Sequence, residues 1–356
     1  MATKPKQATA AAAKSSEVNG RKRINVALQG GGAHGAFSWG VLDKILEDGR
    51  LDIEGISGCS AGSMNAVVYA YGQLKGADGA RQALHDFWKA VSDAGQRFAI
   101  KPTPIEKMMG LNIGKSMVDS SMRMMSKMMS PYQVNPKNAN PLIDILSQQV
   151  DFDELRKSST TKLFLSATNV RTGKVKVFDS HEVTAQAVMA SACLPELFHA
   201  VEIDGEFYWD GGYMGNPVLY PLFYHTDSSD VVIIHVNPIE RAAPPKTALE
   251  ISNRLNEITF NSALMKELRA IGFVQKLMDE GWIKDEYKEK MKYVLMHSLR
   301  AENALSDLSA ESKMESDWGF LTMLRDRGRT YATEWLNENY DDIGKRSTVD
   351  VKKAFL

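Results

Sequence analysis

The order of apolar runs along the chain predicts an α/β protein with a mostly parallel central sheet. Residues 24–29, INVALQ, are apolar and β-prone, and in residues 30–49 apolar side chains recur at helical spacing before a final glycine. Residues 51–57, LDIEGIS, repeat the strand pattern ahead of a second helical stretch. Because strands joined by a helical crossover pair in parallel, we expect these two strands to lie side by side.

Composition narrows the possible functions. The chain has 356 residues, 44% of them apolar, and can bury a sizeable core in one domain or two. Its 43 Lys and Arg balance 44 Asp and Glu, which argues against broad electrostatic binding to nucleic acid. Cys59 and Cys193 are too few for a disulfide framework and lack metal-ligand spacing. No run of about 18 apolar residues predicts a membrane span.

Residues 1–23 are predicted to form a disordered basic tail. They carry six basic residues and one acidic residue, without an apolar segment of the length that a secretory signal needs. We therefore expect a cytoplasmic protein. An alternative role for the tail is weak attachment to an anionic surface, where each basic residue contributes roughly 1 kcal/mol.

Residues 76–150 lose the strand-helix alternation and are predicted to be mostly helical. Eight of the 18 methionines lie between Met108 and Met129. One helical stripe in this segment holds Val118, Met122, Met125 and Met129. Such a stripe is typical of a helix packed on the core. The alternative is a mobile cover whose flexible thioethers line an acyl-chain site.

Strand patterns return later in the chain, at residues 162–170, 174–180 and 230–236, with a helical stretch at 184–194. After a proline-rich break, helical periodicity resumes at residues 248–280 and 318–339. We therefore expect one domain over residues 24–238, with a helical insertion at 76–150. A helical extension packed on the core follows at residues 239–356.

The segment GGGAHG, residues 30–35, fits the pattern G-x-G-x-x-G between a strand and a helix. A dinucleotide site begins in this way, but it also needs an acidic residue at the end of the second strand. That strand ends in Ser57 and Gly58, and Glu54 lies near its beginning. The sequence therefore disfavours a nicotinamide cofactor.

The segment GCSAG, residues 58–62, predicts a nucleophile elbow that exposes Ser60 at a sharp strand-to-helix turn. Acyl transfer also needs backbone N–H groups for the developing oxyanion, and Gly31, Gly32 and Ala33 are the candidates. Adjacent parallel strands end side by side, so the glycine loop and the elbow should meet in one crevice.

A serine hydroxyl also needs a base to accept its proton. Asp210, in the segment WDGGYMGNP, is the leading candidate, because Gly211 and Gly212 allow a tight turn toward the serine. An aspartate of ordinary pKa, about 3.9, is a weaker base than histidine. Two alternatives stay open: a Ser60, Asp210, His297 triad, and an Asx-type loop without catalytic function.

Together, GGGAHG, GCSAG and DGG resemble the patatin-like phospholipase family, from about Ile24 to Pro238. The stretches NPLIDIL at 140–146 and ASACLPELF at 190–198 add to the resemblance. It implies Ser60 as nucleophile, Asp210 as base, a three-layer α/β/α fold, and ester hydrolysis without a metal or cofactor. The supporting motif residues are Gly30, His34, Gly35, Gly58, Gly62, Gly211 and Gly212.

His34 departs from the family pattern, which often has Arg or Lys in the glycine loop. Whether His34 is protonated or only donates a hydrogen bond stays open, and residues beyond 245 match no motif. We expect a metal-independent lipid acyl hydrolase, similar to phospholipase A or lysophospholipase. The alternatives are an intracellular polyhydroxyalkanoate depolymerase and a non-catalytic protein of a lipid or granule surface.

Overall fold

The computed structural model describes residues 17–18, 20–98, 129–241, 243–288, 291–302 and 304–355. Its strands form one sheet in the order β6-β7-β4-β3-β2-β8-β9, with β1 paired to β2 and β5 paired to β4. Their bounds are β1 Glu17–Val18, β2 Arg21–Leu28, β3 Leu51–Gly58, β4 Lys162–Asn169, β5 Val175–Asp179, β6 Val201–Ile203, β7 Glu206–Asp210, β8 Asp230–His235 and β9 Leu295–Arg300. The five strands from β4 to β9 are parallel, as expected, and the edge pairings of β1, β5, β6 and β7 are antiparallel.

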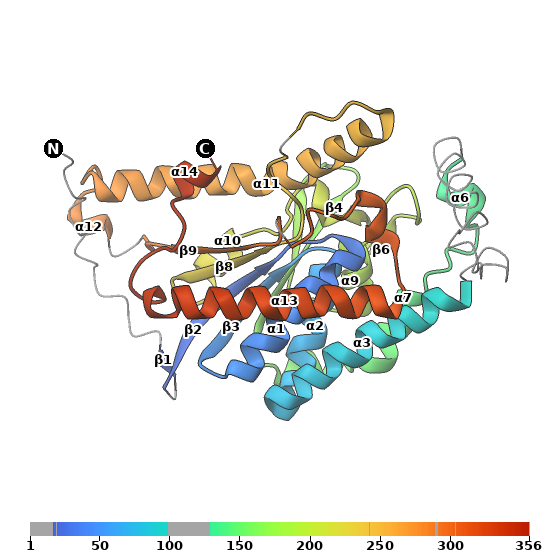
Figure 1. The fold of residues 1–356 in the computed structure, drawn as a ribbon, viewed down its shortest axis with the longest axis horizontal. Helices are drawn as coiled ribbons and strands as arrows, with labels where there is room; N and C mark the ends of the chain where they lie inside the picture. Colours follow the sequence, from blue (N-terminus) through green and yellow to red (C-terminus); the bar gives the residue numbers. More distant parts are fainter. Residues whose placement is uncertain are drawn as a thin grey trace.

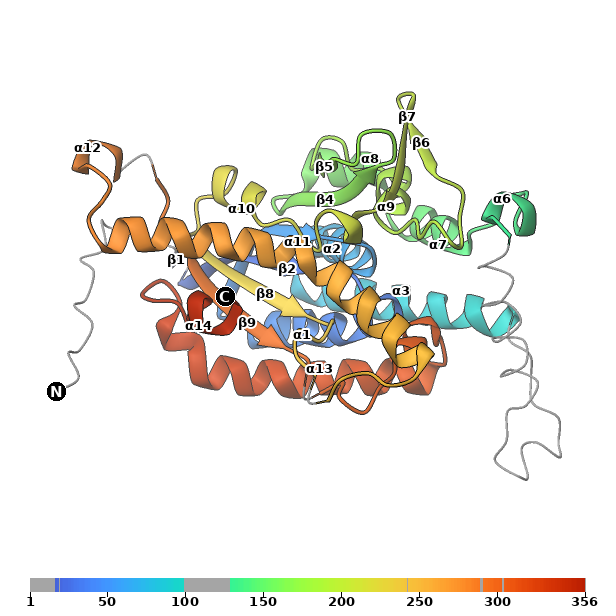
Figure 2. The same cartoon turned by 90° about the horizontal axis from the view of Figure 1, so that it is seen from above.

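Helices cover both faces of the sheet, which confirms the three-layer α/β/α prediction (Figure 1). One face carries α1 Gly35–Asp48, α2 Ala61–Gly72, α3 Gly76–Phe98 and α13 Trp318–Asn339, and the other carries α10 Tyr220–Tyr224, α11 Ala248–Asp279 and α14 Val351–Phe355. The remaining described helices are α6 Pro131–Val134, α7 Pro141–Gln149, α8 Phe152–Ser158, α9 Ala185–Ser191 and α12 Asp285–Lys288. The hairpin of β6 and β7 extends at one edge of the molecule, beside α9 (Figure 2).

Alternate residues of the central strands serve two separate cores. In β2, Val26 and Leu28 belong to the core under α1 and α13, whereas Ala27 faces the core under α11. Every second side chain of a strand points to the same face, so a strand between two helical layers is apolar over most of its length. Continuous apolar runs at these strands therefore follow from the layered fold.

Local signals define the end of α1 and the beginning of α11. Helix α1 ends at Gly49, whose φ of 72° is the left-handed conformation that glycine adopts freely. Helix α11 begins at Thr247 with a capping box: the Thr247 hydroxyl accepts from the Glu250 N–H, and the Glu250 carboxylate accepts from the Thr247 N–H. None of the described helices is long and apolar enough to cross a membrane.

Three expectations about the chain's organisation need correction or fall outside the described residues. The expected tail was too long, because residues 17–18 form β1 and residues 21–23 open β2. The extension was not all helical, since residues 295–300 form β9 beside β8. A short buried apolar run does not distinguish strand from helix by periodicity. Of the methionine-rich stripe, only Met129 lies within the described residues, where it is exposed.

Candidate active site

Ser60 sits at a sharp turn between β3 and α2. Its φ of 53° and ψ of −122° place a non-glycine residue in a strained conformation, as a nucleophile elbow requires. A Cβ on Gly62 would lie 2.3 Å from the Leu28 carbonyl oxygen, so only glycine lets the elbow pack against the end of β2. The predicted turn is therefore present with its predicted glycine support.

Asp210 ends β7 and is fully buried. Its Oδ1 accepts a hydrogen bond of 2.7 Å from the Gly212 N–H, and the Cys59 thiol lies 3.6 Å from the same oxygen. Its Oδ2 has no hydrogen-bond partner of regular geometry among the described residues. Burial raises the pKa of Asp210 to about 6, although the Gly212 N–H and the Ser60 hydroxyl oppose the shift.

The carboxylate is therefore a stronger base than the sequence indicated. An exposed aspartate has a pKa near 3.9, and the expectation above used that ordinary value. Complete desolvation disfavours the anion and brings the pKa of Asp210 closer to neutral pH. A base works best when its pKa lies near the working pH, so burial improves Asp210 for this role.

The last residue of α9 and the two residues after it connect Ser60 and Asp210. The Ser60 N–H is shared by the Ser191 carbonyl at 3.2 Å and the Ser191 hydroxyl at 3.0 Å. Two residues later, the Cys193 carbonyl accepts a 2.7 Å hydrogen bond from the Asp210 N–H. Residues 191–193 thus fix the backbones of both candidate catalytic residues, and both cysteines of the chain are free and buried.

The glycine loop lies against the elbow, and Gly31 and Gly32 line the same cavity as Ser60 and Asp210. Neither backbone N–H donates a hydrogen bond to another of the described residues. Ala33 is buried in the turn η1, Gly32–His34, and does not line the cavity. Two free donors beside a candidate nucleophile are what a developing oxyanion needs.

Close backbone packing explains the glycines of all three motifs. A Cβ on Gly30 would lie 2.7 Å from the Ser60 Cβ, so a larger residue would push the loop off the elbow. Contacts under 3.0 Å would arise in the same way at Gly31, Gly35, Gly58, Gly211 and Gly212. The loop and the elbow are therefore packed directly against each other, whereas the turn after Asp210 packs against Ser166 of β4 and Phe260 of α11.

Comparison with known protein families places this chain. The model of the family described as patatin-like phospholipase matches residues 26–222, more than half of the chain. The chain belongs to the patatin-like phospholipase family. Membership supports lipid acyl hydrolysis as its general activity.

Solved structures give distant likenesses over most of the chain. VipD from Legionella pneumophila has 13% identity and a TM-score of 0.43, with 93% of this chain and 72% of that chain covered. ExoU of the Pseudomonas aeruginosa type III secretion system, solved in complex with SpcU, has 15% identity and a TM-score of 0.32. That match covers 88% of this chain and 53% of ExoU. A search of curated proteins gave no match.

A buried amide network that the sequence analysis missed holds the glycine loop of this family member. The Gly30 N–H donates to Asn216 Oδ1 at 2.7 Å, and the Gly30 carbonyl accepts from Asn237 Nδ2 at 2.7 Å. Gln29 Oε1 accepts from the Asn237 N–H, while Gln29 Nε2 donates to Asn261 on α11. Their positions were the available sequence signal, because Gln29 directly follows β2 and Asn237 lies two residues after β8.

The two histidines considered from the sequence do not act as bases in this arrangement. His34 is buried, its Nε2 lies 2.7 Å from the Ser312 hydroxyl, and burial lowers its pKa to about 3, helped by the charges of Lys313 and Arg241. His34 is therefore neutral. His297 uses Nε2 on Asp230 at 2.9 Å and Nδ1 on Thr348 at 3.0 Å, outside the cavity. The structure thus gives no support to the triad alternative.

The cavity beside Ser60 has a volume of about 470 Å³, and the C-terminal part of the chain forms much of its wall. Its lining from the family-matched region comprises Gly31, Gly32, Ser60, Leu194 and Asp210, and the rest comes from Asn237, Ala248, Leu249, Ser252, Asn253, Asn256, Phe260, Glu311, Lys313 and Met314. No group of three or more His, Cys, Asp or Glu among the described residues could hold a metal ion.

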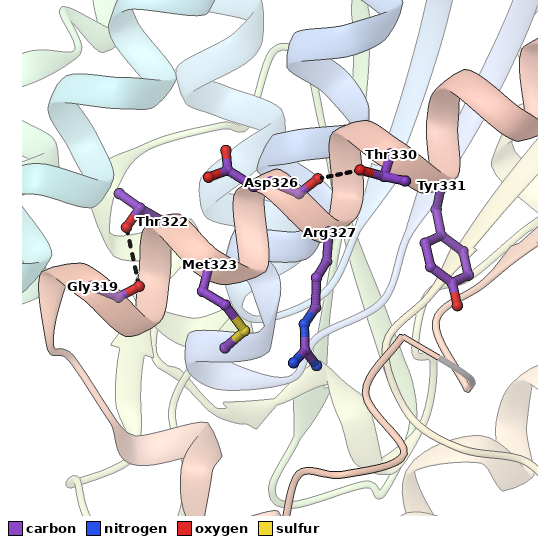
Figure 3. A pocket seen from close by; sticks show the side chains of 7 residues that line it. All are labelled: Gly319, Thr322, Met323, Asp326, Arg327, Thr330 and Tyr331. Carbon is purple, nitrogen blue, oxygen red and sulfur yellow. Dashed lines mark hydrogen bonds between the residues drawn. The ribbon is translucent and has the colours of Figure 1, made fainter.

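A second hollow, of about 540 Å³, lies along the outer face of α13 and is formed by residues of that helix alone (Figure 3). Two of its hydroxyls, on Thr322 and Thr330, bond back to the carbonyls of Gly319 and Asp326 (Figure 3). Its arginine, Arg327, is paired with Asp307. This hollow offers no activated nucleophile, so the cavity at Ser60 is the candidate active site.

Proposed function

We propose that this protein is a metal-independent serine hydrolase that cleaves carboxyl esters of lipids, as phospholipase A or a lysophospholipase does. One observation carries the proposal: Ser60, Asp210 and the free N–H groups of Gly31 and Gly32 converge on one cavity. The free Asp210 Oδ2 leaves one position for the serine proton.

The reaction follows from these positions. Ser60 Oγ attacks the ester carbonyl carbon and its proton passes to Asp210, while the Gly31 and Gly32 N–H groups receive the oxyanion. The tetrahedral intermediate collapses, the carbon–oxygen bond to the alcohol breaks, and Asp210 returns the proton to the leaving oxygen. A water then attacks the acyl-enzyme with Asp210 as base again, and the carboxylic acid and free Ser60 are released.

The cavity wall suits an acyl chain presented at an apolar surface. Leu194 and Phe260 line its interior, and Leu249 and Met314 line its outer part with exposed fractions of 50% and 68%. Exposed apolar side chains beside a cavity are typical of contact with a lipid phase. We therefore also propose peripheral contact with a membrane or granule surface, and cytoplasmic placement stays a prediction.

Substrate hydrolysis and labelling together test the proposal. Phospholipids, acylglycerols, short p-nitrophenyl esters and polyhydroxyalkanoate are offered in the presence of EDTA, and an active-site-directed fluorophosphonate is mapped by mass spectrometry. We expect labelling at Ser60 and hydrolysis of lipid esters, both lost in Ser60→Ala. Ser252→Ala is the matched control, because Ser252 lines the same cavity without an elbow.

Other results of these assays would contradict the proposal or favour one of the alternative functions. Full activity of Ser60→Ala, or labelling only elsewhere, would reject the Ser60 mechanism. Cleavage of polyhydroxyalkanoate in preference to all lipids would identify a depolymerase. Absence of hydrolysis and labelling in the wild-type protein would favour a non-catalytic surface protein. Loss of activity on a soluble ester in EDTA, with recovery on adding calcium, would contradict metal independence.

A further inference from the structure

The glycine loop contains no Lys or Arg, but the C-terminal region brings a lysine to the cavity. Residues 30–35 include neither Lys nor Arg, and His34 is neutral because burial lowers its pKa to about 3. Lys313, in the turn η4, Ala310–Met314, lines the cavity that also holds Ser60. It lies 253 positions along the chain from the candidate nucleophile, so only the fold brings the two together.

Lys313 is anchored to the glycine loop through two contacts. Its Nζ donates a 2.7 Å hydrogen bond to Asn237 Oδ1, and Asn237 Nδ2 holds the Gly30 carbonyl. A Cβ on Gly32 would lie 2.3 Å from the Lys313 carbonyl oxygen, so the turn packs directly on the loop. The position of the ammonium is therefore set relative to the candidate oxyanion site.

The charge of Lys313 is not neutralised by a direct ion pair to the described residues. Glu257, whose charge favours the protonated lysine, is already bound by Arg241 at 2.5 Å and Arg254 at 3.0 Å. Glu311 also lines the cavity, where its Oε1 accepts from Asn253 Nδ2 at 3.4 Å. Burial lowers the pKa of Lys313 to about 8, which still leaves it mostly protonated at pH 7.

An ammonium has three N–H donors, and Asn237 accepts one of those of Lys313. The remaining donors lie in a half-buried position where a charge-assisted hydrogen bond to an anion is stronger than in water. A phosphate group offers several acceptor oxygens to such a donor. An uncharged alcohol of the same size offers no negative charge.

We propose that Lys313 binds the phosphate of a phosphate-bearing ester substrate and thereby sets the preference of the active site for anionic over neutral lipids. This inference rests on the proposed hydrolysis at Ser60 and adds a substrate class to it. The specificity then comes from the C-terminal region, outside residues 26–222 that match the family model.

The test compares two soluble esters that differ only in the phosphate: 1-hexanoylglycerol 3-phosphate and 1-hexanoylglycerol. Lys313→Gln should lower kcat/KM on the phosphate ester at least about tenfold more than on the neutral ester, mainly through KM. Lys313→Arg should retain the preference, because it keeps the cation. Lys352→Met, an exposed lysine on α14, is the control and should change neither value.

A binding measurement keeps the inference separate from catalysis. Calorimetry with hexyl phosphate, inorganic phosphate and hexanol uses Ser60→Ala and Ser60→Ala/Lys313→Gln, after thermal melting shows both folded. We expect hexyl phosphate to bind at least about tenfold more weakly to the double variant, with inorganic phosphate binding weakly to both. Ester inactivity of the wild-type protein would reject the proposed function while this binding result still tests Lys313.

Three results would overturn the inference. Equal losses on both esters would make Lys313 a support for the glycine loop instead of a phosphate ligand. Unchanged hexyl phosphate binding in the double variant would remove the subsite. Inorganic phosphate binding as tightly as hexyl phosphate would identify free phosphate, and not a lipid headgroup, as the ligand.

Discussion

The candidate active site is built from two regions that differ in how much their sequences reveal. Residues 24–238 supply Ser60, Asp210 and the glycine loop, each within a short glycine-framed motif. Residues 239–355 carry no motif, yet α11 and η4 form the opposite wall of the cavity. Motifs therefore identify the candidate reacting groups, whereas the lysine and most of the apolar side chains around them belong to residues outside any motif.

Two carboxylates with raised pKa values, one in each region, show a related difference. Asp210 faces the cavity, and burial raises its pKa to about 6. Glu267 of α11 lies outside the cavity lining, and burial raises its pKa to about 7, although it accepts hydrogen bonds from the N–H groups of Leu219 and Tyr220. A raised pKa therefore does not by itself identify a catalytic group, and access to the substrate decides.

The largest expected effect is the difference in kcat between the variants Asp210→Asn and Glu267→Gln. Asp210→Asn should lower kcat about 10³-fold, because an amide cannot accept the Ser60 proton. Its melting temperature at pH 7 should not fall, since the change removes a buried charge. Glu267→Gln should leave kcat within twofold, because its amide oxygen still accepts both N–H groups. Equal kinetic losses in the two variants would contradict the assignment of Asp210 as base.

The contact between the two regions is tested at Gly32. Both Gly32 and Gly49 have left-handed φ angles, of 56° and 72°, so alanine at either should cost about 1–2 kcal/mol in free energy of unfolding. Only Gly32 faces an obstacle, the Lys313 carbonyl. Gly32→Ala should also lower kcat/KM by up to about 10²-fold, the scale of one lost oxyanion donor. Retained activity in Gly32→Ala would show that η4 does not hold the loop.

The sequence alone predicted the glycine loop, Ser60 and Asp210, because each lies in a tight turn that its neighbouring residues specify. The glycine loop and the elbow directly follow predicted strands, so the tight turn at Ser60 could be predicted. The strand before Asp210, β7, was not predicted, and the two glycines after Asp210 indicated that turn. The role of Lys313 could not be predicted, because its hydrogen bond to Asn237 joins residues 76 positions apart. The raised pKa of Asp210 could not be predicted either, because it depends on the burial of this side chain by several segments of the chain.

The pH dependence of kcat/KM tests whether burial raises the pKa of Asp210. The folded-state pKa of Asp210, about 6, is above its ordinary value of 3.8, so the base is protonated and inactive at lower pH. On a soluble ester, kcat/KM should fall about tenfold per unit below pH 6 and level off above it. The contribution of Asp210 to the free energy of unfolding has the opposite sign: it is favourable at acid pH and is lost as pH rises through 6. A decrease in kcat/KM that begins only near pH 4 would indicate a base with the pKa of an exposed carboxylate and would contradict the raised pKa of Asp210.

The smallest expected effect concerns the outer face of α11. Leu255 is 60% exposed next to the cavity-lining residues Asn253 and Asn256, whereas Phe273 is 58% exposed about 27 Å further along the same helix. If this end of α11 contacts the lipid surface, Leu255→Gln should lower activity on vesicles about fivefold, because about 1 kcal/mol of apolar burial is lost. Activity on a soluble ester and the melting temperature should stay unchanged, since the side chain is exposed. Phe273→Gln is the control and should behave as wild type in both assays. Equal vesicle losses in the two variants would place the contact along the whole helix, and no loss in either would remove α11 from the lipid-binding surface.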